Sequence, residues 1–388
     1  MDPKDFSPSQ RQYLRKTLDG HVAYFPPPTA RSFRLEPADI ALLSTADRAL
    51  GELSGVGRRL REPRMFIRPY LRREAVLSSR IEGTQSSLSD LLLFEAAGSP
   101  AAGSGDAREV LNYVHALERG IARLPKLPLS LRLVLEMHGV LMSGVRGQTS
   151  AAGRFRDSQN WIGPRGTPIE NATFVPPPPP ALAAALDDWE KYIHEQDEVP
   201  PLVRCALLHF QFETIHPFTD GNGRLGRLLM PLFLIEQGCL SQPMLYLSAY
   251  FEERRSEYYN ALGEGRRSGD LRPWIHLFLD AIAVQSVDAS RRADELTRLE
   301  GDYRRRIESS RSRVTHLVVD LLFANMYVTA SLVAKKLGVT PLSARASIGD
   351  LEKRGILEEI TGRKSGRIYA AREIVGIVDR PHAKQPAP

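Results

Sequence analysis

One short segment gathers the residue types that phosphate chemistry needs. The segment TIHPFTDGNGRLGR, residues 214–227, precedes an apolar run that predicts a helix over 224–237, ended by Gly238. Glycines on both sides of Asn222 predict a turn whose backbone N–H groups are free, at the positive end of that helix. Arg224 and Arg227 are three residues apart and therefore share a helix face. Free amides, a helix dipole and two guanidinium groups predict a site for a polyphosphate.

An acid and a base accompany this anion site. Asp220 lies in a strongly basic segment, where a carboxylate is useful if it holds Mg²⁺ against phosphate oxygens. His216 follows the apolar run LVRCALLHFQFETI, and an imidazole beside phosphates is suited to act as general base for a hydroxyl nucleophile. The residues therefore predict formation of a phosphoryl or nucleotidyl ester.

Two other interpretations of the segment are weaker. A structural loop could use the arginines in salt bridges and His216 as a helix cap, but it would not need all of these residue types together. His216 and Asp220 could instead bind zinc. Pro217 and the glycines interrupt the helical i,i+4 spacing that a helical zinc motif requires. The combination favours the phosphate site.

HPFTDGNGRLGR resembles the signature HPFxxGNGRxxR of Fic-domain proteins at every fixed position. The resemblance implies a protein adenylyltransferase, which moves AMP from ATP to a Ser, Thr or Tyr hydroxyl of a target protein and of itself. It implies that His216 deprotonates the target hydroxyl and that Asp220 holds Mg²⁺ on the α- and β-phosphates. Gly221, Asn222 and Gly223 would form the anion hole. Arg224 and Arg227 would contact the β- and γ-phosphates.

A second family element lies upstream. SSRIEG, Ser78–Gly83, resembles the [S/T]xxxE[G/N] pattern of self-inhibited Fic proteins, at the end of a predicted helix. It implies that Glu82 pairs with Arg227, the guanidinium that the γ-phosphate needs. In some relatives the same glutamate serves removal of AMP, and that possibility stays open here. Alternatively, Glu82 is an exposed residue that pairs with a nearby arginine (Arg72, Arg73 or Arg80).

Two further segments resemble substrate-binding parts of the family. NWIGPRGTPIENATFV within 158–176 predicts a β-hairpin similar to the flap on which the target docks. The alternative is an ordinary surface hairpin. Tyr250 and Tyr258, in the segment 245–262, would lie near the adenine, although aromatic residues in a helical pattern equally indicate core packing. The prolines at 176–180 indicate a stiff connector rather than a ligand for an SH3-type domain.

The chain of 388 residues is long enough for two or three modules. We expect an N-terminal helical region with the inhibitory helix over 1–100, a Fic core over 101–285, a helical linker over 286–313, and a winged helix with a tail over 314–388. The fold class is therefore mainly α: a Fic-type helical bundle core with a small β-hairpin flap, an N-terminal helical region and a C-terminal winged helix-turn-helix. Residues 1–35 predict an extended segment.

The basic character belongs to the C-terminal module. Residues 301–388 hold 16 Lys and Arg against 9 Asp and Glu, whereas the rest of the chain holds 36 against 37. This asymmetry permits binding of DNA through the winged helix, although a solvated face or a protein-interaction module is also consistent with it. The sequence also lacks a long apolar run, a secretory signal and a disulfide framework. We therefore expect a cytoplasmic protein with no membrane partner.

Two functions follow from these observations. The first is a self-inhibited AMP transferase that binds ATP and Mg²⁺. Its partners would be a target protein docked on the flap and a second copy of the chain in a homodimer. The second is a DNA-binding regulator or antitoxin-like protein that senses a nucleotide. Intact His216 and Asp220 favour the first function, because sensing a nucleotide needs no general base.

Overall fold

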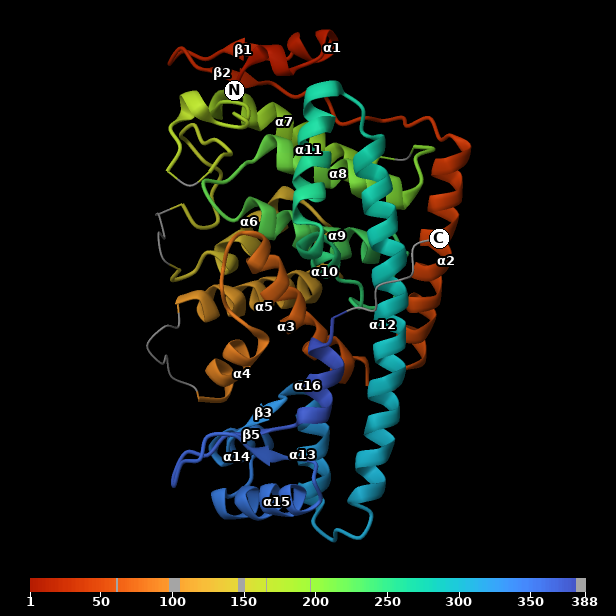
Figure 1. Ribbon diagram of the computed structural model, residues 1–388, viewed down its shortest axis with the longest axis vertical. Coiled ribbons are helices and arrows are strands. Elements are labelled where there is room, and N and C mark those ends of the chain that lie inside the picture. Colours follow the sequence, from red (N-terminus) through yellow and green to blue (C-terminus); the bar gives the residue numbers. More distant parts are fainter. Residues whose placement is uncertain (61, 98–104, 146–150, 165, 196, 382–388) are drawn as a thin grey trace.

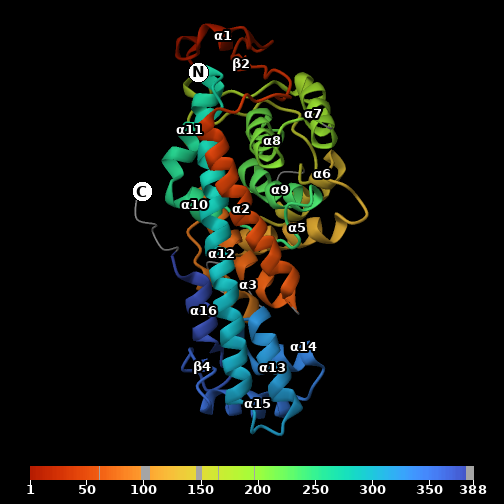
Figure 2. The ribbon, with the colours of Figure 1, turned by 90° about the vertical axis from the view of Figure 1, so that its right-hand side faces the viewer.

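The longest element, helix α12 (Arg272–Arg306), runs along most of the length of the computed structural model (Figure 1). The structure describes all residues except 61, 98–104, 146–150, 165, 196 and 382–388. Helix α2 (Pro37–Arg59) packs beside α12, as two views at right angles agree (Figures 1 and 2). The protein is mainly helical, as predicted. No described helix has the length and apolar character needed to cross a bilayer.

The segment HPFTDGNGRLGR lies in a helical core between the two ends of the molecule (Figure 1). The core and N-terminal helices are α3 (Pro63–Ile81), α4 (Leu88–Ala97), α5 (Gly105–Arg123), α6 (Leu131–Leu141), α7 (Pro179–His194), α8 (Pro201–Ile215), α9 (Asn222–Glu236), α10 (Ser248–Glu253) and α11 (Arg255–Ser268). Proline occupies the first turn of α2, α3, α7 and α8, where its missing N–H costs no hydrogen bond. The proline run 176–180 therefore leads directly into α7.

Helix α8 is the centre of this core. Every residue from Leu202 to Ile215 is buried. A helix that is buried on all sides packs against neighbours in every direction, and α8 contacts α7, α9 and α12. Its C-terminal end, which carries His216, is therefore rigidly held.

The stretch predicted as a helical linker, 286–313, is not a separate helix, because its residues up to Arg306 belong to α12 and Arg313 begins α13 (Arg313–Ala324). Helix α12 continues through residue 286, and its second half buries Ala289, Leu296 and Tyr303. The buried side chain of Arg292 pairs with Asp288 and donates to backbone carbonyls near the C-terminal end of the described chain. Because such partners are distant in sequence, the polar residues of this helix looked solvent-facing from sequence alone.

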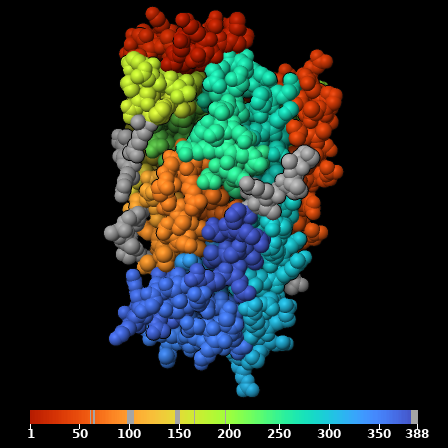
Figure 3. Space-filling model, viewed as in Figure 1, coloured from red at the N-terminus to blue at the C-terminus, as the bar shows by residue number. Residues whose placement is uncertain are grey.

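The C-terminal module forms the opposite end from the N-terminal segment (Figure 3). It contains α13 (Arg313–Ala324), β3 (Tyr327–Val328), α14 (Ala330–Leu337), α15 (Pro341–Lys353), β4 (Glu358–Glu359) and β5 (Tyr369–Ala370). The strands form an antiparallel sheet in the order β3-β5-β4. Gly338 joins α14 to α15 with φ of 66°, a conformation that suits glycine. The helix–turn–helix and hairpin thus follow the predicted order. Helix α16 (Arg372–Asp379) was not predicted; it packs on α12 and α3.

The first residues hold more structure than expected. They form the short helices η1 (Pro3–Asp5) and α1 (Pro8–Arg11), then an antiparallel hairpin of β1 (Leu14–Lys16) and β2 (Val22–Tyr24). The rings of Phe6 and Tyr24 pack against Phe174 of the predicted flap. In its described residues, the flap has one antiparallel bridge between Ile162 and Phe174, with a 3-10 turn η2 (Ile169–Asn171) between them. The boundary predicted at residue 100 and the end of the tail lie outside the described residues.

Candidate active site

His216 ends helix α8 in a backbone conformation that is unusual for its residue type. Its φ is 49° and its ψ is 60°, and it is the one non-glycine residue with positive φ in the described parts of the chain. Such conformations cost energy and occur most often at functional sites. The carbonyl of His216 accepts hydrogen bonds from Arg156 Nε at 2.9 Å and Asn160 Nδ2 at 3.3 Å. These bonds hold the strained residue in place.

The turn between α8 and α9 is fastened by its own asparagine. The side chain of Asn222 accepts from the Phe218 N–H and donates to the Phe218 carbonyl, both at 2.8 Å. Gly221 has φ of 81°, and a Cβ there would lie 2.9 Å from Met142 Sδ. The asparagine side chain therefore shapes the turn, while the first backbone amides of α9 have no acceptor within their helix.

The carboxylate of Glu82 lies at this helix N-terminus. A Cβ on Gly223 would approach Glu82 Oε1 to 2.3 Å, which shows how closely the carboxylate covers the first turn of α9. Glu82 Oε1 also accepts from Arg227 Nη2 at 2.7 Å. The predicted pairing of Glu82 with Arg227 is therefore present. Of the alternative partners, Arg72 binds Glu95 instead.

Arg227 is deeply buried, and its guanidinium is held from two directions. Its side chain is 1% exposed, and it donates to Ser78 Oγ at 2.8 Å and to the Ser78 carbonyl at 2.9 Å, in addition to Glu82. Ser78 and Glu82, the two positions that define the upstream element, thus contact the same arginine. A negative group already occupies the place where the motif predicts a phosphate.

Arg224 points to other partners than Arg227. Its guanidinium lies 3.1 Å from Glu109 Oε2 on α5 and 3.4 Å from Asp220 Oδ1. The side chain of Asp220 is 66% exposed. Its carboxylate is therefore accessible from the cleft, which suits a metal ligand that works together with phosphate oxygens. Within the described residues, no cluster of three or more His, Cys, Asp or Glu could hold a metal alone. Magnesium would accordingly need the nucleotide to complete its ligands.

These residues open onto one large cleft of about 1190 Å³. Its predicted lining residues are Glu82, His216, Asp220, Gly223, Arg227 and Tyr258. Flap residues, among them Trp161 and Ile162, form another part of its wall. The cleft thus joins the anion site, the imidazole and the flap in a space large enough for a nucleotide and a peptide segment.

The imidazole of His216 is kept neutral. Burial lowers its pKa to about 3, and the positive charges of Arg266 and Arg156 act in the same direction. A neutral imidazole at physiological pH is able to accept a proton. Burial has the opposite effect on the neighbouring carboxyl of Glu213, whose pKa it raises to about 7.

The two tyrosines differ in their placement. Tyr258 lines the cleft and its hydroxyl lies 2.9 Å from His209 Nε2. Tyr250 is not among the lining residues; its hydroxyl donates to Asp280 on α12, and Arg254 stacks on its ring at 4.1 Å. The hydroxyl of Tyr250 therefore faces α12, and the place of Tyr250 near the adenine stays a prediction. The neighbour of Tyr258 in the chain, Tyr259, also lines the cleft.

Three residues that support the turn were not singled out from sequence. Besides Arg156 and Asn160, His138 on α6 contacts the Asp220 carbonyl through Nε2 at 3.0 Å and accepts from the Gly153 N–H. Its ring stacks on Phe218 with centroids 3.7 Å apart. Only Arg156 had a sequence signal, the Gly-x-x-Arg run at 153–156. His138 and Asn160 bind backbone atoms of residues far away in the sequence, and no local sequence pattern predicts such contacts.

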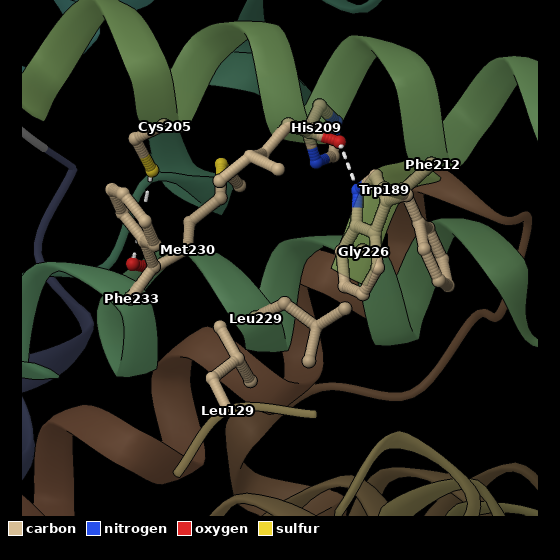
Figure 4. Close-up of a pocket in the computed structure, with 10 residues that line it drawn as sticks. Leu129, Trp189, Cys205, His209, Phe212, Gly226, Leu229, Met230 and Phe233 are labelled. Carbon is tan, nitrogen blue, oxygen red and sulfur yellow. Dashed lines mark hydrogen bonds between the residues drawn. The ribbon is translucent and has the colours of Figure 1, made fainter. Parts of the chain in front are cut away.

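Helices α8 and α9 meet behind the turn in an apolar contact (Figure 4). A cavity of about 20 Å³ lies there, lined by residues such as Trp189, Leu229 and Phe233. Gly226 allows the close approach, because a Cβ there would lie 2.5 Å from Glu213 Oε1. The third glycine of the motif is therefore needed for helix packing.

Comparison with known families agrees with this geometry. Residues 40–122 match the family model described as Fic/DOC family N-terminal, and residues 128–234 match that of the Fic/DOC family. The chain therefore contains a Fic N-terminal domain and a Fic domain. The matched Fic region contains the turn, α8 and most of α9, and the N-terminal match contains Ser78 and Glu82.

Individual relatives carry the same family name. The chain is 31% identical over 172 residues to a protein adenylyltransferase Fic of Drosophila grimshawi, and 30% identical over 172 residues to that of Drosophila erecta. Each alignment covers 44% of this chain, but 31% and 30% of the relatives. The chain therefore spans about a third of the length of the curated relatives it matches.

A solved structure extends the similarity of the fold. A Fic family protein from Desulfovibrio desulfuricans G20 has a TM-score of 0.55 and 19% sequence identity. The match covers 89% of this chain and 98% of that protein. At this identity the match concerns the fold alone.

Proposed function

We propose that this Fic protein transfers AMP from ATP to a Ser, Thr or Tyr hydroxyl of a target protein, and of itself. The observation that carries the proposal is the position of the Glu82 carboxylate, which covers the first turn of α9 and pairs with Arg227 in the cleft that holds a neutral His216. A site that attracts a carboxylate in this way is suited to a phosphate. Curated relatives named protein adenylyltransferase support AMP as the group transferred.

Each group of site residues would have a separate role in the reaction: phosphate binding, proton transfer or magnesium binding. Amides of Gly221, Asn222 and Gly223 would bind phosphate oxygens, with Arg224 and Arg227 on the outer phosphates. His216 would take the proton of the target hydroxyl, whose oxygen forms a bond to the α-phosphorus while the bond to the leaving pyrophosphate breaks. Asp220 would hold Mg²⁺, which when bound neutralises charge on the phosphates.

Glu82 would restrain this activity. While it occupies Arg227, the γ-phosphate lacks its guanidinium and the α-phosphate is displaced from the line of attack. Misplacement of reacting groups is costly in transfer reactions. The glutamate is 34% exposed and sits at the end of α3, so it can leave the arginine without unfolding the core. Whether the same glutamate also serves AMP removal is tested by following release of AMP from labelled protein.

The target would dock beside the flap. The bridge Ile162–Phe174 already pairs backbone groups, and a target segment could add to it by backbone hydrogen bonds. Tyr258, in the cleft wall, would lie near the nucleotide.

The decisive experiment separates AMP transfer from phosphate transfer. The Glu82→Gly variant is incubated with cell lysate and ATP labelled either on the α- or on the γ-phosphate, and His216→Ala is the control. Label in protein from α-labelled ATP only, lost in His216→Ala, is the expected result. Label from γ-labelled ATP would indicate phosphorylation, and no label from either would contradict the proposal.

A second function, DNA binding, is supported by a basic groove on the C-terminal module. The groove, of about 1110 Å³, lies between α14, α15 and the loop that joins β4 to β5. Its cations are Lys335, Lys336, Arg345, Arg363, Lys364 and Arg367. No carboxylate of the described residues forms a salt bridge with any of them, whereas Arg354 and Arg372 of the same module are paired. Unpaired cations around a helix–turn–helix suit DNA phosphates.

Salt dependence tests this second function. The double variant Arg363→Ala/Lys364→Ala should bind a random-sequence duplex more weakly and reduce the slope of log affinity against log salt by about 2. Arg59→Ala/Lys126→Ala removes two exposed cations elsewhere and should leave the slope unchanged. Equal slopes in the two variants would exclude the groove as a DNA site. A protein that binds DNA but never labels a target would instead favour the nucleotide-sensing regulator.

A further inference from the structure

Two buried polar atoms, one in the imidazole of His216 and one beside it, have no hydrogen-bond partner among the described residues. They are His216 Nδ1 and Glu213 Oε1, and the other carboxylate oxygen, Glu213 Oε2, lies 3.9 Å from that same Nδ1. The side chain of Glu213 is 8% exposed. Most buried polar atoms in proteins are hydrogen-bonded, so an unsatisfied one needs a physical explanation, of which a catalytic role is one. A small rotation of either side chain would bring the carboxylate and the imidazole within hydrogen-bond distance.

The local fold keeps these two groups together. Glu213 is in the last turn of α8, three residues before His216, and α8 is buried throughout. Gly226 of α9 faces Glu213 without a side chain, and a Cβ there would lie 2.5 Å from Oε1. The missing side chain leaves room for the carboxyl beside the imidazole.

Charged and titratable groups from every neighbouring element face Glu213. They are His209 and His216 from α8, Arg227 from α9, Glu82 after α3, and Tyr258 and Arg266 from α11. Burial raises the pKa of Glu213 to about 7, whereas the positive charge of Arg227 lowers it and the negative charge of Glu82 raises it. The carboxyl is therefore poised to gain or lose a proton at physiological pH. When Glu82 leaves Arg227, the electrostatic effect of these two charges on the pKa of Glu213 would also change.

We propose that Glu213 is the positioning residue of the catalytic base. Its carboxylate accepts a hydrogen bond from Nδ1–H of His216, which selects the tautomer whose Nε2 is unprotonated and free to receive the proton of the target hydroxyl. When Nε2 takes that proton, the imidazolium is stabilised by the carboxylate, and no further reactant is needed. The inference rests on the proposed AMP transfer, because it assigns a role around the base of that reaction.

Nitrogen NMR of the histidine side chains tests the inference without any catalytic turnover. With imidazole nitrogens labelled and His216 assigned by its absence in His216→Gln, the wild type at about pH 8 should show Nδ1 protonated and Nε2 unprotonated. Glu213→Leu, which has similar volume and no acceptor, should shift His216 towards the Nε2–H tautomer. An unchanged tautomer would overturn the proposal. This readout does not depend on ATP, so its failure is separate from failure of the proposed function.

Kinetics provide the second readout. In the Glu82→Gly background, Glu213→Gln should lower kcat by on the order of 10²-fold, with KM for ATP little changed. Its pH–rate profile should lose the rise near pH 7 that the Glu213 carboxyl contributes. Glu236→Gln is the matched control, since Glu236 also has a buried oxygen without a partner but lies outside the cleft. Equal kcat and equal profiles in both variants would refute the role of Glu213, as would a loss explained fully by a lower melting temperature.

Discussion

Replacing Glu82 by glycine should tighten binding of Mg·ATP substantially. In the wild type, the γ-phosphate can reach Arg227 only after the carboxylate has left it, so the free energy of the Glu82–Arg227 contact is subtracted from ATP binding. The contact is a charge-assisted hydrogen bond of 2.7 Å, and the glutamate is 34% exposed. Such bonds contribute about 1.5–3 kcal/mol, and partial exposure favours the lower half of that range. A contribution of about 1.5–2.2 kcal/mol corresponds to about 10- to 40-fold in Kd.

The same change should cost only modest stability. Arg227 keeps its two hydrogen bonds to Ser78, at 2.8 and 2.9 Å, so its buried charge is not left without acceptors. We expect a loss of about 1–2 kcal/mol in the free energy of unfolding, less than the 3–5 kcal/mol that follows when a fully buried ion pair loses one partner.

Calorimetric titration measures the effect directly. The Kd for Mg·ATP is compared between His216→Ala and Glu82→Gly/His216→Ala, so that no turnover disturbs the titration, at fixed ionic strength because both partners are charged. Glu82→Gln, which keeps the side-chain length but removes the charge, should give an intermediate gain. Glu257→Gln changes an exposed glutamate on α11 by the same substitution and should have no effect.

One result would refute the reasoning. If Glu82→Gly bound ATP with the wild-type Kd and labelled protein at the wild-type rate, the carboxylate would not compete with a phosphate. If Glu82→Gly bound ATP more tightly but transferred AMP no faster, Glu82 would still compete with the γ-phosphate for Arg227. The proposal that Glu82 inhibits AMP transfer would then be wrong.

Three further outcomes are expected. Gly223→Ala should weaken ATP binding in calorimetry by more than about tenfold, because its Cβ would fill the place 2.3 Å from the Glu82 carboxylate where a phosphate should lie; unchanged affinity would place the phosphates elsewhere. Asp220→Asn should remove most of the magnesium dependence of ATP binding, and an unaltered magnesium titration would contradict its role. Burial lowers the pKa of His138, His209 and His216 to about 3 or 4. Each imidazole is therefore neutral in the folded protein, and protonation favours the unfolded state. Their contribution to stability is complete above pH 6.5 and is lost as pH falls. Urea unfolding at about pH 4.5 should therefore show roughly 2 kcal/mol less stability per histidine than at pH 7, partly offset by Glu213, whose raised pKa acts in the opposite direction. Equal stability at both pH values would contradict these shifts.

Much of the local structure could be predicted from the sequence because its causes are local. Prolines at first turns and Gly338 at a turn mark helix limits by their own backbone preferences. The motif around His216 names its chemistry through residue types within a dozen positions. The resemblance added Glu82 as the partner of Arg227, a pairing across 145 residues that periodicity cannot supply.

Weak local signals led to the errors. The flap is small, with one antiparallel bridge among its described residues, and the N-terminal segment packs against it, which the sequence did not indicate. The hairpin β1–β2 was missed because its strands have three residues each. The polar half of α12 appeared to be a linker, because its partners on α2 and α16 lie far away in the chain.

The sequence by itself determined which residues could bind phosphates, hold magnesium and accept a proton, because residue type and short spacing fix those capacities. Only the tertiary structure decided what each side chain faces: Arg224 towards Glu109, Tyr250 towards Asp280, and Glu213 towards Gly226. The physical reason is that helical spacing identifies a face but not its neighbour. Burial beside that neighbour then sets the pKa of His216 and makes a neutral base from an ordinary imidazole.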